Sequence, residues 1–188
     1  MLRMIDALIS SKTRIKLLLK FFLNSNTTAY LRNLESEFGD STNSIRLELN
    51  RLEEAGMLLS ATDGNKKIFR ANIRHPLFLE IHTILLKHIG LDRIVEDVIK
   101  RLGDIRQVYL IGEFSRGLDS PIIDLIFVGN IDKNYLLELV EKAEKLVKRK
   151  IRYLIYTPEE ATAINWADYD PKPFQLWDGA PENRLLYP

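Results

Sequence analysis

The sequence predicts an α+β protein of two parts, a helical domain that ends in a β-hairpin and a small α/β domain that follows it. Three observations support this prediction. Apolar residues recur at helical spacing through residues 11–55, an Asp-Gly turn signal follows at 63–64, and short runs rich in branched residues lie at 108–111 and 122–128. The composition, with 46% hydrophobic and 28% charged residues in 188 positions, is typical of an ordinary globular protein.

Two helices are expected at the start of the chain. The segment 11–23 places apolar residues on one face, a serine at position 10 or 11 can cap its first turn, and the polar run 24–28 ends it. A second helix is expected over 30–38, with Gly39 as its stop.

A third helix follows the polar run 40–42, whose side-chain oxygens can accept hydrogen bonds from its first amides, and runs to about residue 55. Its expected buried stripe consists of Ile45, Leu49 and Leu52. The strands 58–61 and 67–71 should then pair as a hairpin, because an Asp-Gly turn favours positive φ. Three helices and a hairpin in this order are the layout of a winged helix-turn-helix, which we assign to residues 1–75.

The opposite face of the third helix predicts contacts with double-stranded DNA. Small or polar residues at a helix start can enter the major groove, and a guanidinium or a carboxamide one turn further on can pair with guanine or adenine. On this helix the predicted DNA-binding residues are Ser41, Thr42, Asn43, Ser44, Arg46, Asn50 and Arg51. At the hairpin tip, where a wing would contact phosphate or the minor groove, they are Asn65, Lys66 and Lys67. The alternative interpretation is a solvated helix face and a solvated turn.

Charge is divided unevenly along the chain. Residues 1–75 hold 12 Lys and Arg against 8 Asp and Glu, a net charge of +4, whereas residues 76–188 hold 15 against 18, a net charge of −3. A basic module joined to an acidic one is expected of a DNA-binding protein, because phosphate neutralisation supplies most of the non-specific affinity. We expect a homodimer, because one recognition helix contacts only a few base pairs.

The second part of the chain is expected to be a small mixed α/β domain at 105–158, preceded by two helices at 76–104 that we interpret as a connector and dimerisation segment. The expected elements of the domain are strands at 108–111, 122–128 and 151–156 and a helix over 133–150. The inward residues of that helix should be Leu136, Leu139, Val140, Ala143, Leu146 and Val147. Residues 159–188, rich in prolines and aromatic residues, are expected to form an irregular tail.

The run 43–58 carries a recognisable pattern that begins Asn43-Ser44-Ile45-Arg46 and ends Leu52-Glu53-Glu54-Ala55-Gly56-Met57-Leu58. This pattern resembles the winged-helix domain of ArsR-like regulators, and its end is similar to a bacterial signature, L-x-x-x-G-hydrophobic, that joins the recognition helix to the wing. The resemblance implies a sequence-specific transcription regulator. The chain contains no cysteine, so sensing of heavy metals by thiolates is not implied.

A second pattern is Gly112-Glu113-Phe114-Ser115-Arg116-Gly117 followed by the apolar run 122–129. It resembles the signature of minimal nucleotidyltransferases, G-S-x-x-[RK]-G…[ST]-D-x-D-L-x-V. The resemblance implies that the glycine turn holds nucleotide phosphates and that two aspartates, one residue apart on a strand, bind Mg²⁺. Here Asp124 stands at the second aspartate position, Ile122 stands at the first, and Glu113 replaces the serine.

These departures predict a retained fold without catalysis. The vestigial motif consists of Gly112, Glu113, Arg116, Gly117 and Asp124. Asp119 is not expected to replace the missing ligand, because it lies in the loop and off the strand register. We therefore predict a DNA-binding transcription regulator that is not an enzyme and has no metal or cofactor, with its effector unidentified.

Two alternatives stay open. The chain could be an active nucleotidyltransferase that uses the winged helix for targeting or autoregulation, or its winged helix could bind a protein.

The three histidines, His75, His82 and His88, do not form a ligand pattern with known metal spacing. The apolar run near the start is interrupted by Lys20 and is too short to span a bilayer, and no signal sequence is recognisable, so we expect a cytoplasmic protein without membrane contact.

Overall fold

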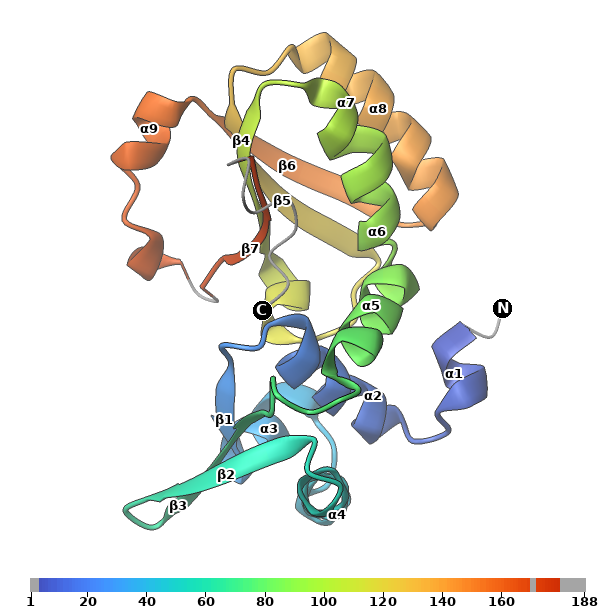
Figure 1. Ribbon diagram of the computed structural model, residues 1–188, viewed down its shortest axis with the longest axis vertical. Helices are drawn as coiled ribbons and strands as arrows, with labels where there is room; N and C mark the ends of the chain where they lie inside the picture. Colours follow the sequence, from blue (N-terminus) through green and yellow to red (C-terminus); the bar gives the residue numbers. More distant parts are fainter. Residues whose placement is uncertain (1–3, 170–171, 180–188) are drawn as a thin grey trace. The chain divides into compact units, whose positions relative to one another are not determined.

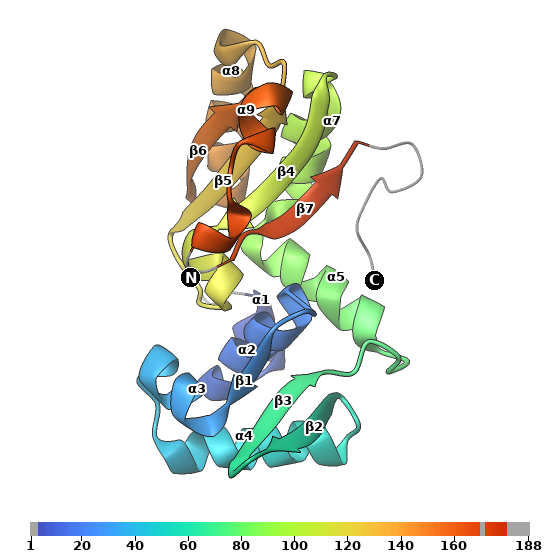
Figure 2. The same ribbon diagram turned by 90° about the vertical axis from the view of Figure 1, so that its left-hand side faces the viewer.

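The computed structural model describes residues 4–169 and 172–179, and the chain divides into two compact units between His88 and Ile89. Figure 1 and Figure 2 show the elements of each unit coloured along the sequence. Within the described ranges, no helix combines the length and apolar composition needed to cross a lipid bilayer.

The N-terminal unit is built of helices and a three-stranded sheet. Its elements are α1 (Met4–Leu8), α2 (Lys12–Leu18) with its π-helical continuation η1 (Leu19–Leu23), β1 (Thr28–Tyr30), α3 (Leu31–Phe38), α4 (Thr42–Glu54), β2 (Leu58–Asp63), β3 (Lys66–Ala71) and α5 (Phe78–Ile89). Apolar residues predicted to be inward form the core, and Phe22, Ile45 and Leu49 are at most 1% exposed. The ring of Phe78 on α5 stacks on that of Phe22 at 5.4 Å between centroids.

The turn between α3 and α4 is set by local sequence. Gly39 ends α3 in the left-handed conformation, with a φ of 65°, which favours glycine. The Ser41 side chain accepts a hydrogen bond from the Ser44 amide and begins α4. The predicted bounds of α3 and α4 agree with the structure to within a residue. Tyr30, predicted as the first residue of the second helix, instead belongs to β1.

The sheet of the N-terminal unit has the antiparallel order β1-β3-β2. Asp63 pairs with Lys66, so the hairpin turns on two residues, Gly64 and Asn65, and Gly64 has the positive φ that the turn requires. The hairpin is therefore confirmed. The strand β1 was not predicted, because its three residues carry no alternation and are held only by pairing with β3.

The C-terminal unit is a four-stranded mixed sheet with helices. Its elements are α6 (Leu91–Ile94), η2 (Val95–Ile99), α7 (Lys100–Leu102), β4 (Ile105–Ile111), η3 (Gly112–Arg116), β5 (Ile122–Gly129), α8 (Lys133–Val147), β6 (Lys150–Tyr156), α9 (Pro158–Thr162), η4 (Trp166–Asp168) and β7 (Phe174–Asp178). The strand order is β6-β5-β4-β7, with β6 parallel to β5 and the other pairs antiparallel.

The two faces of this sheet are covered differently. On one face lie α8 and the α6–α7 segment, and on the other lies α9 (Figure 1, Figure 2). The inward side chains of α8, which are buried, are Leu136, Leu139, Val140 and Ala143. On the α9 side Ile126, Val128 and Ala161 form a small core, against which several aromatic rings pack, among them Trp166 stacked on Tyr109 at 4.5 Å.

Three features differ from the sequence predictions. The segment 76–104, interpreted as a dimerisation element, is divided between the units, and the apolar side chains of α6 and η2 are buried within the C-terminal unit, where these elements contact α8. The described part of the tail is not irregular, because Phe174–Asp178 pairs with β4. The helix over 133–150 ends at Val147, and Leu146 points outward with 60% exposure, since the stripe of four inward residues already covers the sheet.

Candidate functional site

The outward face of α4 carries polar side chains that the fold does not use. Asn43, Arg46 and Asn50 are exposed, one helical turn apart along the helix. None of the three side chains has a hydrogen bond or ion pair among the residues that the structure describes. A guanidinium and two carboxamides in this arrangement can donate to or accept from a partner without first breaking an internal contact.

Other predicted contact residues at the start of α4 bond within the unit. The Ser41 side chain caps the helix, the Ser44 hydroxyl lies 3.1 Å from the Thr13 hydroxyl, and Thr42 Oγ1 donates to Glu35 Oε1 at 2.6 Å. Hydroxyl groups can turn toward internal acceptors, a possibility that helical periodicity does not reveal. These three side chains fix the helix start.

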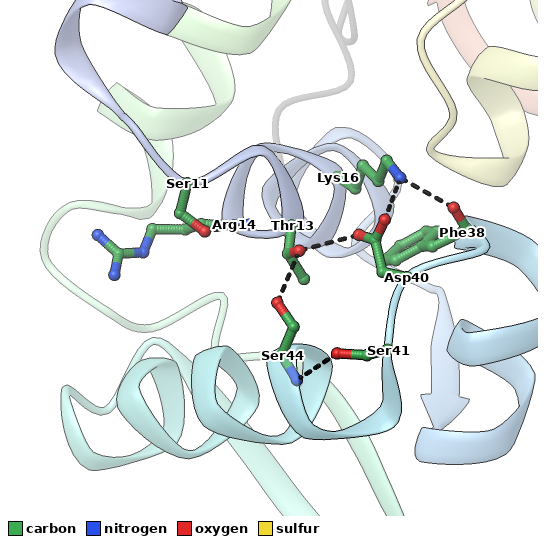
Figure 3. A network of polar contacts seen from close by, with 8 residues as sticks. All are labelled: Ser11, Thr13, Arg14, Lys16, Phe38, Asp40, Ser41 and Ser44. Atoms are coloured by element: carbon green, nitrogen blue, oxygen red, sulfur yellow. Dashed lines mark hydrogen bonds and ion pairs between the residues drawn. The ribbon is translucent and has the colours of Figure 1, made fainter.

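A polar network holds α4 against α2 (Figure 3). Asp40, in the turn before α4, accepts from the Thr13 hydroxyl at 2.9 Å and from Lys16 Nζ at 2.7 Å. Lys16 Nζ also donates to the Phe38 carbonyl, the last residue of α3, at 2.9 Å. The turn that begins α4 is thus tied to α2 by charge-assisted hydrogen bonds, which are stronger than neutral ones.

A second ion-pair group lies along α4 and includes the predicted contact residue Arg51. The carboxylate of Glu48, only 4% exposed, accepts from Arg14 Nε at 2.7 Å and from Arg51 Nη1 at 3.3 Å. Burial acts to raise the pKa of Glu48, but hydrogen bonds from Arg14 and Ser11 and the two guanidinium charges lower it below its usual value. Arg51 is therefore less free than Arg46 to meet a partner.

The two hairpin lysines differ in their surroundings. Lys67 Nζ lies 2.6 Å from Glu53 Oε2, and the hydrogen bonds from Lys67 and Ser60 lower the pKa of Glu53. Lys66 Nζ instead lies 4.7 Å from the centre of the Tyr30 ring, a cation–π contact that leaves its positive charge unneutralised. Asn65 is exposed at the turn between the strands.

A recess of about 420 Å³ lies between α3, α4 and the hairpin. The residues that line it are Tyr30, Leu31, Arg32, Arg46, Leu49, Asn50, Asn65, Lys66, Lys67 and Phe69. Five of them, Arg46, Asn50, Asn65, Lys66 and Lys67, are predicted DNA contacts, whereas Tyr30 and Arg32 are not. Tyr30 enters the recess because β1 pairs with β3, a contact between distant segments for which the sequence carries no local signal. Arg32 lies in the first turn of α3, which follows β1 directly.

In the C-terminal unit, the loop after β4 meets β5 at Asp124. Gly112 has a φ of 70°, and a side chain there would overlap the carboxylate of Asp124, so glycine permits both the backbone and the close approach. Ser115 Oγ donates to the Gly112 carbonyl at 2.8 Å. Asp124 is 9% exposed and accepts from Arg152 Nε at 2.6 Å.

The residues at this site do not fit a Mg²⁺ ion. Ile122, which stands at the position of the first aspartate, pairs with Lys150 of β6. Asp119 forms an ion pair with Arg149 at 2.9 Å. Arg149 also lies 5.1 Å from the centre of the Phe114 ring, and burial lowers its pKa. In the part of the chain that the structure describes, no three Asp, Glu, His or Cys side chains gather as a metal site.

Two of the remaining residues of the motif, Glu113 and Arg116, are more open to solvent than Asp124. Glu113 is exposed, Arg116 is half-buried, and Gly117 ends the loop in the left-handed conformation. The loop therefore brings Gly112 close to Asp124, while Asp119 is paired with Arg149.

Two solved structures are similar to part of this chain. The toxin–antitoxin MntA-HpeT, solved as a mutant, is 15% identical, covers 49% of this chain and 75% of its own, and has a TM-score of 0.37. A protein of Sulfolobus solfataricus named as a candidate nucleotidyltransferase is 21% identical, covers 58% of this chain and 93% of its own, and also has a TM-score of 0.37. No protein-family model and no curated protein matches the sequence.

These comparisons correct the expectation that the protein is not an enzyme. One of the two neighbours is named as a nucleotidyltransferase, and the expectation that this protein is not an enzyme is therefore withdrawn. The likeness is one of a mixed α+β fold and assigns no substrate. Neither structure is an ArsR-like regulator, and the winged-helix assignment stays a prediction.

Proposed function

We propose that the N-terminal unit is a winged helix-turn-helix that binds double-stranded DNA, with α4 as recognition helix and the β2–β3 hairpin as wing. The observation that carries this proposal is the exposure of Asn43, Arg46 and Asn50 on one face of a helix whose hydroxyls at Thr42 and Ser44 are internally bonded. Arginine pairs with guanine and asparagine with adenine in the major groove, so these side chain types suit sequence recognition.

The order and size of the elements support the same proposal. A turn of three residues joins α3 to α4, and the hairpin begins four residues after α4 ends. Lys66 at the hairpin tip supplies a positive charge that is not neutralised by a carboxylate in the described residues. We infer a homodimeric transcription regulator, because two recognition helices give a palindromic site and the affinity that one helix lacks.

Selection of genomic DNA fragments on the purified full chain tests this proposal. The expected result is a recovered palindrome, bound with an affinity that falls steeply as salt rises because bound lysines and arginines release counterions. Light scattering of the free protein should give a dimer. The absence of any salt-dependent affinity for duplex DNA would contradict the proposal and favour a protein-binding role for the winged helix.

Nucleotidyl transfer is a second candidate function. The observation that favours it is the contact of the Gly112 turn with Asp124 across two segments of the chain. Incubation with ATP labelled at the α-phosphate, with Mg²⁺ added, would test it by transfer of label to protein or to a co-incubated extract. Loss of transfer in Asp124→Asn but not in Asp119→Asn would support it, whereas no transfer by the unmodified chain would contradict it.

A further inference from the structure

The recess beside α4 has an apolar floor that contact with a DNA backbone does not explain. Leu49 is 1% exposed and Phe69 is 4% exposed, and both line the recess together with Leu31. A duplex presents its phosphates on a convex surface, so it would contact the polar groups at the rim of the recess and not its apolar floor. A concave site of about 420 Å³ with an apolar floor and a few polar groups is instead typical of small-molecule sites.

The charges around the recess all have one sign. Its charged lining residues are Arg32, Arg46, Lys66 and Lys67, and no carboxylate lines it. Lys67 is paired with Glu53, whereas the other three have no ion pair with any residue in the described ranges. Cations that share a small cavity repel one another, so an anion bound among them would be stabilised.

We propose that this recess binds a small phosphorylated organic anion of nucleotide size. Its phosphate lies among Arg32, Arg46 and Lys66, and its apolar or planar part lies on the floor formed by Leu49 and Phe69. The amides of Asn50 and Asn65 are placed at the rim to bond polar groups of the ligand.

Occupancy of the recess would regulate DNA binding. Arg46, Asn50 and Lys66 belong both to the recess and to the proposed DNA surface, so the two ligands exclude each other. This competition rests on the proposed function, whereas ligand binding itself does not. The ligand would therefore act as an effector that releases the protein from its operator.

Titration calorimetry of the full chain without DNA tests the assignment, with ADP as the probe and inorganic phosphate and adenosine as its two fragments. We expect one ADP per recess and at least about tenfold weaker binding of either fragment, since each keeps only part of the contacts. Arg32→Ala should weaken ADP binding about tenfold through loss of a charge-assisted hydrogen bond. Arg70→Ala, an exposed arginine of β3 that does not line the recess, should change it less than about twofold.

The contrary outcomes are distinct. Equal ADP affinity in Arg32→Ala and the unmodified chain would place any binding elsewhere and overturn the assignment. Equal affinity for ADP and inorganic phosphate would also overturn it, because the organic part would then make no contact with the floor. Displacement of bound duplex by ADP, lost in Arg32→Ala, would support the regulatory role. If the chain binds ADP through Arg32 but binds no duplex, the proposed DNA-binding function fails while the recess assignment holds.

Discussion

The polar side chains on the outward face of α4 differ in their surroundings from the carboxylate of Asp124 on β5. On α4, Arg46 and Asn50 are exposed and have no partner among the described residues. On β5, the carboxylate of Asp124 is buried, bound by Arg152 and in contact with the Gly112 turn. The polar groups of the first region have no internal partner in the part of the chain that the structure describes, whereas those of the second hold a loop against a sheet.

This difference has a thermodynamic consequence. Removal of an exposed and unpaired side chain changes stability little, but it removes whatever that side chain contributes to binding. Removal of a buried or closely packed group costs stability, because its partners lose a contact or are left unsatisfied. Substitutions in the two regions should therefore separate stability from DNA binding.

The largest effect is expected from Gly112→Ala. We expect a loss of about 2 to 4 kcal/mol in the free energy of unfolding, from a left-handed backbone that disfavours side chains and from overlap of the new methyl group with the Asp124 carboxylate. Urea unfolding followed by circular dichroism measures it. The matched control is Gly39→Ala, which has the left-handed φ of 65° and open space around it, and should lose only about 1 to 2 kcal/mol. Equal losses would show that the contact with Asp124 contributes nothing.

Next in size is the effect of Arg46→Ala and of Asn50→Ala on DNA. Each should weaken binding to the recovered operator by about 1 to 3 kcal/mol, because each removes a paired contact with a base edge. The free energy of unfolding should change by less than about 0.5 kcal/mol. Fluorescence anisotropy and urea unfolding measure the two quantities. Arg51→Ala, whose side chain is bound to Glu48, should weaken operator binding less than Arg46→Ala, and the reverse order would contradict the placement of the recognition face.

Asp40→Ala tests whether the polar network positions α4. We expect a loss of about 1 to 2 kcal/mol in stability, because Thr13 and Lys16 each lose a hydrogen bond to a partly buried carboxylate. Operator affinity should also fall in conditions where the variant is fully folded, since the start of α4 is no longer tied to α2. Asp40→Asn, which keeps an acceptor for Thr13, should recover part of both losses. Unchanged operator affinity in folded Asp40→Ala would assign the network to stability alone.

A smaller effect is expected at the hairpin. Lys66→Ala should weaken binding to all DNA sequences alike, by up to about 1 kcal/mol, and should lower the slope of log affinity against log salt by about one. Lys67→Ala should have a weaker effect on the slope, because Glu53 already neutralises that ammonium group. Anisotropy titrations of operator and unrelated duplexes at several salt concentrations measure this. An effect of Lys66→Ala confined to the operator would show that Lys66 contacts a base.

Local signals explain why much of the N-terminal unit could be predicted. The stop at Gly39, the cap at Ser41 and the Asp-Gly turn act through neighbouring residues, so the helices and the hairpin follow from short stretches of sequence. The strands β1 and β7 depend on pairing with β3 and β4, which are distant in the chain, and neither was predicted.

The candidate DNA-binding surface, like the fold, could be predicted only where local sequence determines it. Helical periodicity placed Arg46 and Asn50 outward correctly, because the direction of a side chain follows from its place in the turn. Periodicity does not determine hydrogen-bond partners, and the hydroxyls of Thr42 and Ser44 proved to be bonded within the unit. Arg32 of α3 lines the recess together with residues of α4 and the hairpin that are distant in the chain, so no short pattern could identify it.

The smallest effect is expected from the titration of His82, and it separates the two units by pH. Nδ1 of His82 lies 2.6 Å from the Phe22 carbonyl, and because a carbonyl only accepts, Nδ1 donates. Burial lowers the pKa of His82 below 6.5, although the hydrogen bond to Phe22 acts to raise it. The folded chain therefore takes up this proton less readily than the unfolded chain does. The stability contributed by neutral His82 is present above pH 6.5 and is lost as the pH falls from there through the lowered pKa of the folded state.

Thermal unfolding between pH 7 and pH 5 should therefore shift to lower temperature in the N-terminal unit alone. All three histidines lie at or before residue 88, and both tryptophans, Trp166 and Trp177, lie in the C-terminal unit. Tryptophan fluorescence reports on the second unit, and calorimetry reports on both. His82→Asn, which keeps a donor for the Phe22 carbonyl, should reduce the shift, whereas His75→Asn should not. A shift of the tryptophan transition over the same pH range would contradict the separate response of the two units, because no histidine in the C-terminal unit can cause it.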